Sequence, residues 1–205
     1  MQTAVAILAA YCLGSISFAI VVSWLMRLPD PRSYGSKNPG ATNVLRTGRR
    51  AAAVLTLAGD AGKGWLAVWL ASFFTAEIAL AGLAAFLGHV YPVFHRFQGG
   101  KGVATAAGVL FGLDWRIGLG TVITWIVIAA FLRYSSLAAL VAALFAPCYA
   151  LWAFGLQPLL PVTAAMSVLL VWRHRENIRR LVAGEENRVG SKASPPPQDP
   201  SAGVP

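Results

Sequence analysis

Charged residues are scarce in this sequence. Only 12% of its 205 residues are Asp, Glu, Lys or Arg, whereas 57% are hydrophobic. A soluble domain carries about 25% charged residues, and a membrane-spanning helix needs roughly 20 consecutive apolar residues. The segments Thr3–Met26 and Tyr134–Trp172 contain no charged residue. The composition therefore excludes an ordinary soluble domain and predicts an all-α, polytopic membrane protein.

Cysteine and acidic residues are also few. Cys12 and Cys148 lie in apolar segments without the spacing of metal ligands, which is typical of small buried hydrophobic residues. The 8 Asp and Glu residues are scattered along the chain. The sequence has no G-x-S-x-G motif and no plausible Ser-His-Asp set for nucleophilic catalysis. We therefore expect no metal site and no cofactor.

Charges and turn residues divide the chain into about seven predicted transmembrane helices, some of them short or interrupted. The first run lacks a basic segment before it and a clear cleavage site, which favours a retained span over a signal peptide. The segment GDAGKG, Gly59–Gly64, is expected to interrupt the second span. The predicted spans are Val5–Met26, Ala51–Phe74, Ile78–Phe94, Val103–Leu113, Ile117–Leu132 and two spans separated by Phe154–Pro158, the last ending near Trp172.

The basic residues predict the orientation of the chain in the membrane. The net charge is +9, and of the 17 Lys and Arg residues all except Arg116 fall on one side of the predicted spans. The positive-inside rule makes that side cytoplasmic and places the N-terminus outside. Because the basic residues cluster at span ends, they indicate anionic lipids or substrates and no nucleic acid. We predict a single membrane domain over residues 1–188 and a disordered, Pro/Ser-rich cytoplasmic tail over residues 189–205.

Several polar segments lie on this predicted cytoplasmic side. The loop Asp30–Arg50 spaces Ser36, Asn38 and Asn43 ahead of Arg46, and short polar side chains with an arginine suit a phosphate group. A solvated basic loop is the alternative. Within GDAGKG, Asp60 and Lys63 are three residues apart and share one helical face, so they can pair. Such membrane charges indicate either a functional cavity or a structural ion pair.

The segment FQGGKGVATAAG, Phe97–Gly108, combines glycines with Lys101 directly before a predicted helix of small residues. Free N–H groups and the positive dipole end at a helix N-terminus favour phosphate, and glycines allow close backbone approach. A Walker A motif requires Ser or Thr after its lysine, whereas Gly102 follows Lys101. The sequence therefore predicts phosphate binding without nucleotide hydrolysis. The small residues after Val103 are expected to serve close helix packing.

Two further segments reach the same predicted side. In the segment Trp172–Arg188, His174 and Asn177 share a face of a helix that leaves the membrane. The alternative for His174 is a plain surface histidine. Arg173, Arg179 and Arg180 are interpreted as interfacial anchors. Ser135 and Ser136, in the segment RYSS, have either a turn-capping or a functional role.

Four of these pieces resemble the signature blocks of a known enzyme family. They are Tyr34–Arg46, Gly59–Gly64, Gly88–Thr105 and Arg173–Leu181. In this order they are similar to the bacterial acyl-phosphate:glycerol-3-phosphate acyltransferase (PlsY) family, and the similarity covers about residues 1–188. Lys37 departs from the pattern, because the family usually has Gly or another small residue there.

The resemblance implies a seven-span enzyme of the bacterial inner membrane whose active site faces the cytoplasm. Such enzymes transfer a fatty acyl group from acyl phosphate to the 1-hydroxyl of glycerol 3-phosphate, which gives lysophosphatidic acid and phosphate. The implied partners are these two substrates and membrane lipids, with the protein acting as a monomer. Rival interpretations are a transporter for phosphorylated metabolites and a scaffold or lipid-binding subunit without catalysis.

The resemblance and the residue chemistry together define a set of expected site residues. The Gly99–Gly102 loop is expected to hold the phosphate of acyl phosphate. The proton acceptor stays open between His174, Asp60 and a substrate phosphate. The expected catalytic residues are Ser36, Lys101, His174 and Asn177, and the expected substrate-binding residues are Arg46, Asn38, Asn43, Asp60, Lys63, His89, Gly99, Gly100, Gly102, Thr105 and Ser136.

Overall fold

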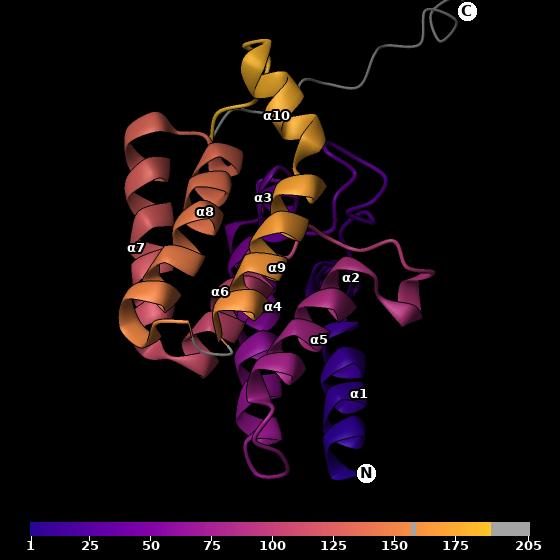
Figure 1. Ribbon diagram of the computed structural model, residues 1–205. Coiled ribbons are helices and arrows are strands. Elements are labelled where there is room, and N and C mark those ends of the chain that lie inside the picture. Colours follow the sequence, from indigo (N-terminus) through magenta and orange to yellow (C-terminus); the bar gives the residue numbers. More distant parts are fainter. Residues whose placement is uncertain (157–158, 190–205) are drawn as a thin grey trace, which may run out of the picture.

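The computed structural model, which describes residues 1–156 and 159–189, is a helical bundle (Figure 1). Within these residues every regular element is a helix, so the predicted all-α class is confirmed. The elements are α1 (Gln2–Gly14), α2 (Phe18–Leu25), α3 (Ala41–Leu45), α4 (Arg50–Ala71), α5 (Ile78–Val90), a 3-10 turn (Val93–His95), α6 (Val103–Leu113), α7 (Trp115–Leu132), α8 (Ser135–Phe154), α9 (Leu159–Arg173) and α10 (Arg175–Val182).

The helices differ in their ability to cross a membrane. Three segments of the described chain are long and apolar enough by themselves: Ile78–His95, Trp115–Leu132 and Ser135–Phe154. The pair α1 and α2 would make a fourth span, with a bend of 44° between its two parts. The apolar helices α6 and α9 are only about 16 Å and 22 Å long at 1.5 Å per residue. The predicted count of seven spans therefore stays a proposal.

The structure changes the picture of the first two predicted spans. The first span has a break that was not predicted, since α1 ends at Gly14 and α2 begins at Phe18. The segment GDAGKG does not interrupt the second span, because α4 runs unbroken from Arg50 to Ala71. Asp60 and Lys63 are both buried and lie 2.8 Å apart, so their opposite charges meet inside the bundle and the helix continues through them.

Small residues bring two pairs of helices close together. A Cβ atom on Gly108 of α6 would lie 1.8 Å from the carbonyl oxygen of Ala61 in α4. A Cβ atom on Gly14 of α1 would lie 2.0 Å from the carbonyl oxygen of Ala85 in α5. Both distances are far shorter than any allowed contact, so these backbones touch directly. The expectation that the small residues after Val103 serve helix packing is confirmed for Gly108.

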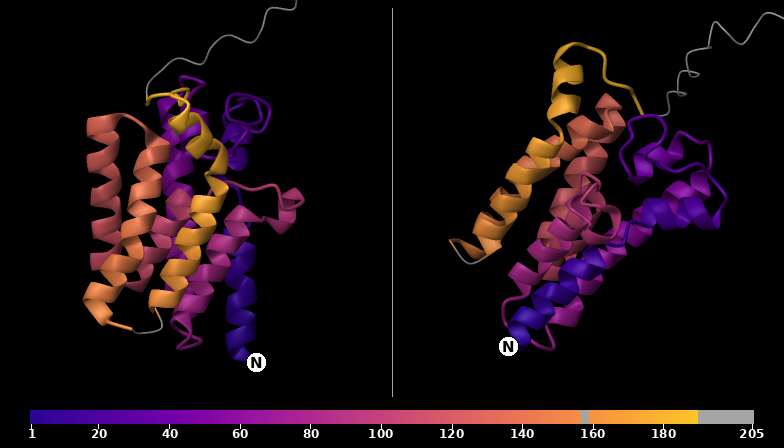
Figure 2. Two further views of the ribbon diagram at one scale, coloured as in Figure 1. Left: turned by 45° about the horizontal axis from the view of Figure 1, so that its top comes forward. Right: turned by 90° about the vertical axis from the view of Figure 1, so that its right-hand side faces the viewer.

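The two ends of the bundle have different characters. The N-terminus of α1 lies at one end, whereas α3, the loop before it and α10 lie at the other (Figures 1 and 2). This second end gathers polar segments that are far apart in the sequence, and we call it the polar end. Of the predicted disordered tail, Val189 is described, and its N–H donates to the carbonyl oxygen of Arg133 at 2.6 Å. Residues 190–205 lie outside the described residues.

Candidate active site

A cavity of about 270 Å³ opens at the polar end. Three segments form its wall: the loop before α3, the glycine-rich loop before α6, and the junction of α9 with α10. The structure thereby brings together five of the predicted site residues, which come from three distant parts of the chain. The lining residues are Ser36, Lys37, Asn38, Gly99, Lys101, Arg173, Arg175, Glu176, Asn177 and Arg180.

Lys101 begins a chain of hydrogen bonds behind this cavity. Its ammonium group donates to Oδ1 of Asn177, and the Asn177 amide donates to Oε1 of Glu186 at 2.6 Å. The Ser136 hydroxyl donates to the same oxygen at 2.8 Å, and Nε of Arg180 donates to Oε2 at 2.7 Å. Lysine is only a donor and an ionised carboxylate only an acceptor, so the Asn177 amide has a single satisfactory orientation.

The cavity is strongly cationic. Burial lowers the pKa of Lys101 to about 8, Glu186 acts in the opposite direction, and the charges of Arg180, Arg173 and Arg46 add to the lowering. A multiply charged anion beside Lys101 would relieve this repulsion and favour the protonated amine. The site is therefore suited to phosphate groups.

Backbone geometry and one arginine shape the glycine-rich loop. Gly102 has φ of +87°, a left-handed conformation that favours glycine, and α6 begins directly after it. The N–H of Gly100 donates to the carbonyl oxygen of His89 at 3.1 Å. The guanidinium of Arg173 donates to the carbonyl oxygens of Gly99 and Gly100 at 3.0 and 3.3 Å. The predicted start of α6 after Gly102 is confirmed.

Asn43 organises the loop before α3 from within. Its side chain is 2% exposed and donates to the carbonyl oxygen of Pro31 at 2.7 Å. Its Oδ1 accepts the N–H of Ser36 at 3.0 Å, which holds the cavity-lining part of the loop. Lys37 adopts φ of +54°, a conformation in which glycine is less strained than lysine. Asn43 is thus placed to shape the loop, and it is not among the lining residues.

Asp60, Lys63 and His89 form a separate buried cluster. The Lys63 ammonium lies 2.8 Å from Asp60 Oδ1 and 3.0 Å from His89 Nδ1, and it donates to the carbonyl oxygen of Ile16 at 2.5 Å. The predicted pairing of Asp60 with Lys63 is confirmed. None of the three lines the cavity, although His89 bonds the glycine-rich loop through its backbone. The cluster joins α4 to the break between α1 and α2.

Four other predicted residues lie near the cavity without lining it. The His174 ring is 2% exposed, and its Nδ1 lies 2.8 Å from the carbonyl oxygen of Leu170. Burial, followed by the charge of Lys101, lowers the pKa of His174 to about 4, so the ring is neutral at pH 7. Arg46 lies against Gly35, and Thr105 is fully buried with its hydroxyl lacking a partner among the described residues. Ser136 bonds Glu186, as described above.

Sequence reasoning missed three functional candidates. Glu186 was not predicted, yet it accepts hydrogen bonds from Ser136, Asn177 and Arg180. Arg173 and Arg180 are more than the predicted interfacial anchors, since they bond the glycine-rich loop and Glu186. The sequence signal that could have pointed to Glu186 is Gly184, because a glycine commonly ends a helix and lets the chain turn back. In the structure Gly184 follows α10 with a left-handed φ of +73°. Within the described residues no three His, Cys, Asp or Glu side chains form a potential metal site.

The fold and the cavity define a helical protein with segments apolar and long enough to cross a membrane and with a cationic cavity at its polar end. The family model for glycerol-3-phosphate acyltransferase matches residues 4–184. The chain belongs to the glycerol-3-phosphate acyltransferase family, so the predicted resemblance is confirmed.

Named relatives and solved structures agree. The chain is 62% identical to glycerol-3-phosphate acyltransferase of Burkholderia pseudomallei (strain K96243), with 94% of this chain and 98% of the relative covered. It is 60% identical to that of Ralstonia nicotianae (strain ATCC BAA-1114 / GMI1000), with 95% and 98% covered. The crystal structure of PlsY, an integral membrane glycerol 3-phosphate acyltransferase in its glycerol 3-phosphate form, matches with a TM-score of 0.87 and 39% identity, covering 93% of this chain and 96% of the other. These similarities decide against the transporter and scaffold alternatives.

Proposed function

We propose that this protein transfers a fatty acyl group from acyl phosphate to the 1-hydroxyl of glycerol 3-phosphate. The products are lysophosphatidic acid and inorganic phosphate. The membership of the chain in the acyltransferase family supports the reaction and the acceptor. The single observation that carries the proposal is the cationic cavity beside Lys101, where charge and hydrogen-bond donors suit phosphate-bearing molecules.

Acyl phosphate as donor fits the chemistry of the cavity. It is a mixed anhydride whose phosphate is a good leaving group, so the reaction needs positioning and charge stabilisation more than a protein nucleophile. The 1-hydroxyl oxygen attacks the acyl carbonyl carbon and forms the ester C–O bond. The bond between the acyl carbon and the phosphate oxygen then breaks, and its electron pair stays on the phosphate. Lys101 neutralises charge that develops on the departing phosphate.

The two side chains considered as proton acceptors are poorly suited to this step. Asp60 is paired with Lys63 inside the bundle and does not line the cavity. Nδ1 of His174 bonds the Leu170 carbonyl oxygen, and the low pKa of this histidine makes it a weak base at pH 7. We therefore assign the proton to a substrate phosphate, which ionises near neutral pH.

The remaining residue roles follow their positions. Ser36 and Asn38 in the cavity wall orient glycerol 3-phosphate, with Arg46 adding positive charge from the loop beside it. Asn177 holds Lys101 in the same wall through its side-chain oxygen. The Gly99–Gly102 loop and the N-terminus of α6 present backbone N–H groups to a phosphate. Asn43 and the cluster of Asp60, Lys63 and His89 hold these loops in place. Thr105 is buried in the first turn of α6, directly after the glycine-rich loop, and His174 is buried at the junction of α9 with α10.

We further propose an inner-membrane enzyme with about seven spans, the polar end in the cytoplasm and the N-terminus outside. Residues 1–188 form the catalytic domain, which acts as a monomer. The experiment that tests the function is an assay of purified protein with an acyl phosphate and radiolabelled glycerol 3-phosphate. Labelled lysophosphatidic acid and equimolar phosphate are the expected products. Formation of that lipid from acyl-CoA, with none from acyl phosphate, would contradict the assigned donor.

A further inference from the structure

The carboxylate of Glu186 lies where donors from two helices converge. Oε1 accepts from the Ser136 hydroxyl of α8 at 2.8 Å and from the Asn177 amide of α10 at 2.6 Å. Oε2 accepts from Nε of Arg180 at 2.7 Å, and the side chain is 9% exposed. Two anionic oxygens that share hydroxyl, amide and guanidinium donors imitate the contacts that proteins make to phosphate.

Two of these donors, Ser136 and Asn177, are among the site residues expected from the sequence. The only hydroxyl hydrogen of Ser136 and one of the two amide hydrogens of Asn177 are directed at Glu186 in the described structure, so a substrate cannot take these hydrogen bonds at the same time. Lys101 fixes the carbonyl end of Asn177, which leaves its amide N–H₂ directed at the carboxylate. Access of a substrate to these donors therefore requires that Glu186 leaves them.

Charge explains why an anion occupies this position in the free protein. Burial opposes ionisation of Glu186, but the hydrogen bonds from Asn177, Ser136 and Arg180 lower its pKa below the usual value for a glutamate. The negative charge of Glu186 also raises the pKa of the nearby Lys101, whereas the positive charges of the surrounding arginines lower it. A vacant position among these cations would be unfavourable, and another anion can take the place of the carboxylate.

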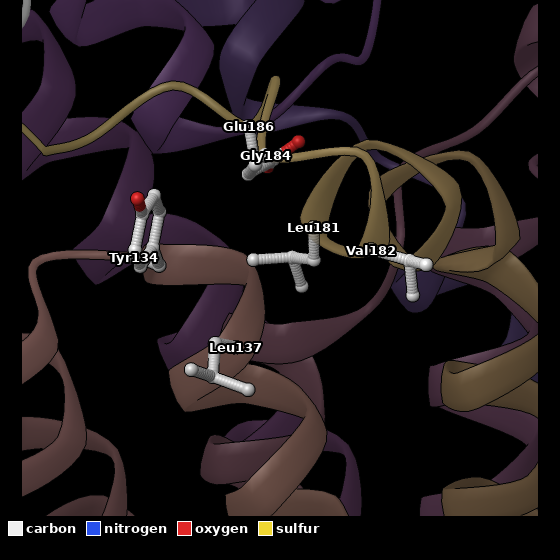
Figure 3. Close-up of a pocket in the computed structure, with 6 residues that line it drawn as sticks. All are labelled: Tyr134, Leu137, Leu181, Val182, Gly184 and Glu186. Carbon is white, nitrogen blue, oxygen red and sulfur yellow. The ribbon is translucent and has the colours of Figure 1, made fainter.

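Two cavities meet at this hydrogen-bond chain. Asn177 lines the polar cavity, and Glu186 borders a second, mainly apolar cavity of about 330 Å³. In Figure 3 Leu181 of α10 extends toward Tyr134 and Leu137 at the start of α8, with Glu186 and Gly184 above the space between them. A ligand with an apolar chain and an anionic head fits at this boundary, whereas glycerol 3-phosphate has no apolar chain and fits the polar cavity.

The segment that carries Glu186 lies outside the bundle and is anchored at both ends. We call residues 184–189 the strap. Gly184, with φ of +73°, connects it to α10. At its other end the N–H of Val189 donates to the carbonyl oxygen of Arg133 at 2.6 Å, and Nε of Arg188 donates to the Tyr134 hydroxyl at 3.3 Å. Because no spanning helix runs through the strap, Glu186 can withdraw without disturbing helix packing.

We propose that Ser136, Asn177 and Arg180 form a second anion subsite, which takes the phosphoryl group of the acyl donor and which Glu186 occupies in the substrate-free protein. Naming the acyl donor rests on the proposed function. The ligand chemistry itself, a phosphate oxyanion, is shared with inorganic phosphate and glycerol 3-phosphate. Binding of the phosphoryl group displaces the carboxylate and transfers the three donors from Glu186 to the ligand.

Two isosteric substitutions test this subsite. Glu186→Gln removes the competing charge, and Glu185→Gln removes the same charge from the exposed neighbouring residue. Inorganic phosphate binding to purified protein is measured by calorimetry. We expect Glu186→Gln to bind phosphate roughly tenfold more tightly, since a charged competitor has been replaced by a weaker neutral one. Glu185→Gln is expected to bind phosphate as the unchanged protein does.

Steady-state kinetics show whether acyl phosphate or glycerol 3-phosphate places its phosphate group in this subsite. We expect the KM for acyl phosphate to fall roughly tenfold in Glu186→Gln, as phosphate binding tightens, with the KM for glycerol 3-phosphate unchanged. Inorganic phosphate should inhibit competitively against acyl phosphate. Competition against glycerol 3-phosphate, together with a lowered KM for that substrate alone, would overturn the assignment to the acyl donor.

Other outcomes distinguish failure of the anion subsite from failure of the proposed function. If Glu186→Gln keeps its melting temperature but binds phosphate no better, Glu186 is a structural residue and the subsite is refuted. Glu186→Asp, which keeps the charge but shortens the side chain, replaces Glu186→Gln if the latter fails to fold; it should also bind phosphate more tightly than the unchanged protein. Tighter phosphate binding by a protein that makes no lysophosphatidic acid would sustain the subsite and refute the proposed function.

Discussion

Lys101 combines a charge with a fixed position. It lines the polar cavity, and its bond to Asn177 connects it to Glu186. We expect Lys101→Met to lower kcat about a hundredfold or more, because an electrostatic contact to the transition state is lost. Acyl transfer by the purified variant is the measurement, with thermal unfolding as a check on the fold.

The matched control is Lys37→Met, which removes the same charge from an exposed residue of the same cavity wall. We expect it to change kcat no more than severalfold, since an exposed charge is screened by water. Equal losses in both variants, or full activity of Lys101→Met, would show that Lys101 has no special role in charge stabilisation.

The pKa of Lys101 gives a second prediction. Its value of about 8 lies below the usual 10.5, so the amine loses its charge as the pH rises through 8. We expect the affinity for glycerol 3-phosphate to fall about twofold between pH 7 and pH 8, and about tenfold or more between pH 8 and pH 9.5, as the protonated amine is lost. Calorimetric titration across this range is the measurement. In Lys101→Arg, whose side chain stays protonated, the affinity should stay flat; an equally steep fall there would assign the titration to another group.

At the scale of single residues, the sequence predicted chemistry better than location. The glycines, Lys101 and Asn177 were identifiable because their types suit phosphate and their segments end apolar runs. Asp60 and Lys63 were identifiable as a pair because they are three residues apart on a helix. Glu186 was missed because Ser136 is 50 residues away in the sequence, and because Asn177 and Arg180 meet Glu186 only through the turn of the chain after α10.

The contact between α4 and α6 depends on small residues. A Cβ atom at Gly108 would meet the Ala61 carbonyl oxygen at 1.8 Å, so we expect Gly108→Ala to push the two helices apart. The expected loss is about 1–3 kcal/mol of stability, as is typical of an overpacked interior. Thermal unfolding of both proteins in the same detergent measures the difference.

Gly62→Ala in α4 is the control for this contact. Apart from the neighbouring residues and backbone of α4 itself, no atom of the described chain lies within 4 Å of the position its Cβ would take. Alanine favours a helix over glycine by about 1 kcal/mol, so this substitution should be neutral or stabilising. If Gly108→Ala also raised the melting temperature, direct backbone contact would not be what holds these helices together.

At the scale of elements, most helix boundaries could be predicted from charges and glycines, and the two features that were missed both involve buried contacts of Asp60 and Lys63. The unbroken α4 was missed because Asp60 and Lys63 resemble a helix interruption until their mutual pairing is known. The break between α1 and α2 was missed because Ser15 and Ser17 scarcely interrupt an apolar run. Its residues have buried roles, since Phe18 N–H donates to Asp60 at 3.4 Å and Ile16 accepts from Lys63.

The whole molecule should sit in the membrane with its polar end in the cytoplasm. This orientation predicts that a cysteine at Gln2 reacts with a membrane-impermeant maleimide in intact spheroplasts, and that a cysteine at Glu185 reacts only after lysis. The natural Cys12 and Cys148 are first replaced by alanine in both proteins. Labelling of a cysteine at Glu185 alone before lysis would reverse the proposed topology, and labelling of both positions would place both ends of the chain outside and contradict it.

The Pro/Ser-rich tail is expected to be dispensable. Deletion of residues 191–205 should leave kcat and both KM values within about twofold, because polar low-complexity sequence does not build a packed core. The deletion ends beyond Val189 and thus spares the strap and its bond to Arg133. A large loss of activity in the purified, folded variant would place part of the tail in the working enzyme.

The sequence by itself determined the membrane class, the approximate helices, the orientation expected from basic residues and the family. These follow from hydrophobicity, charge and local motifs, which depend on residues near one another in the chain. Only the tertiary structure decided that α4 is continuous, that Arg173 holds the glycine-rich loop, and that Glu186 meets Ser136 and Asn177. Those contacts join segments that helix packing brings together, and packing depends on the whole set of side chains at once.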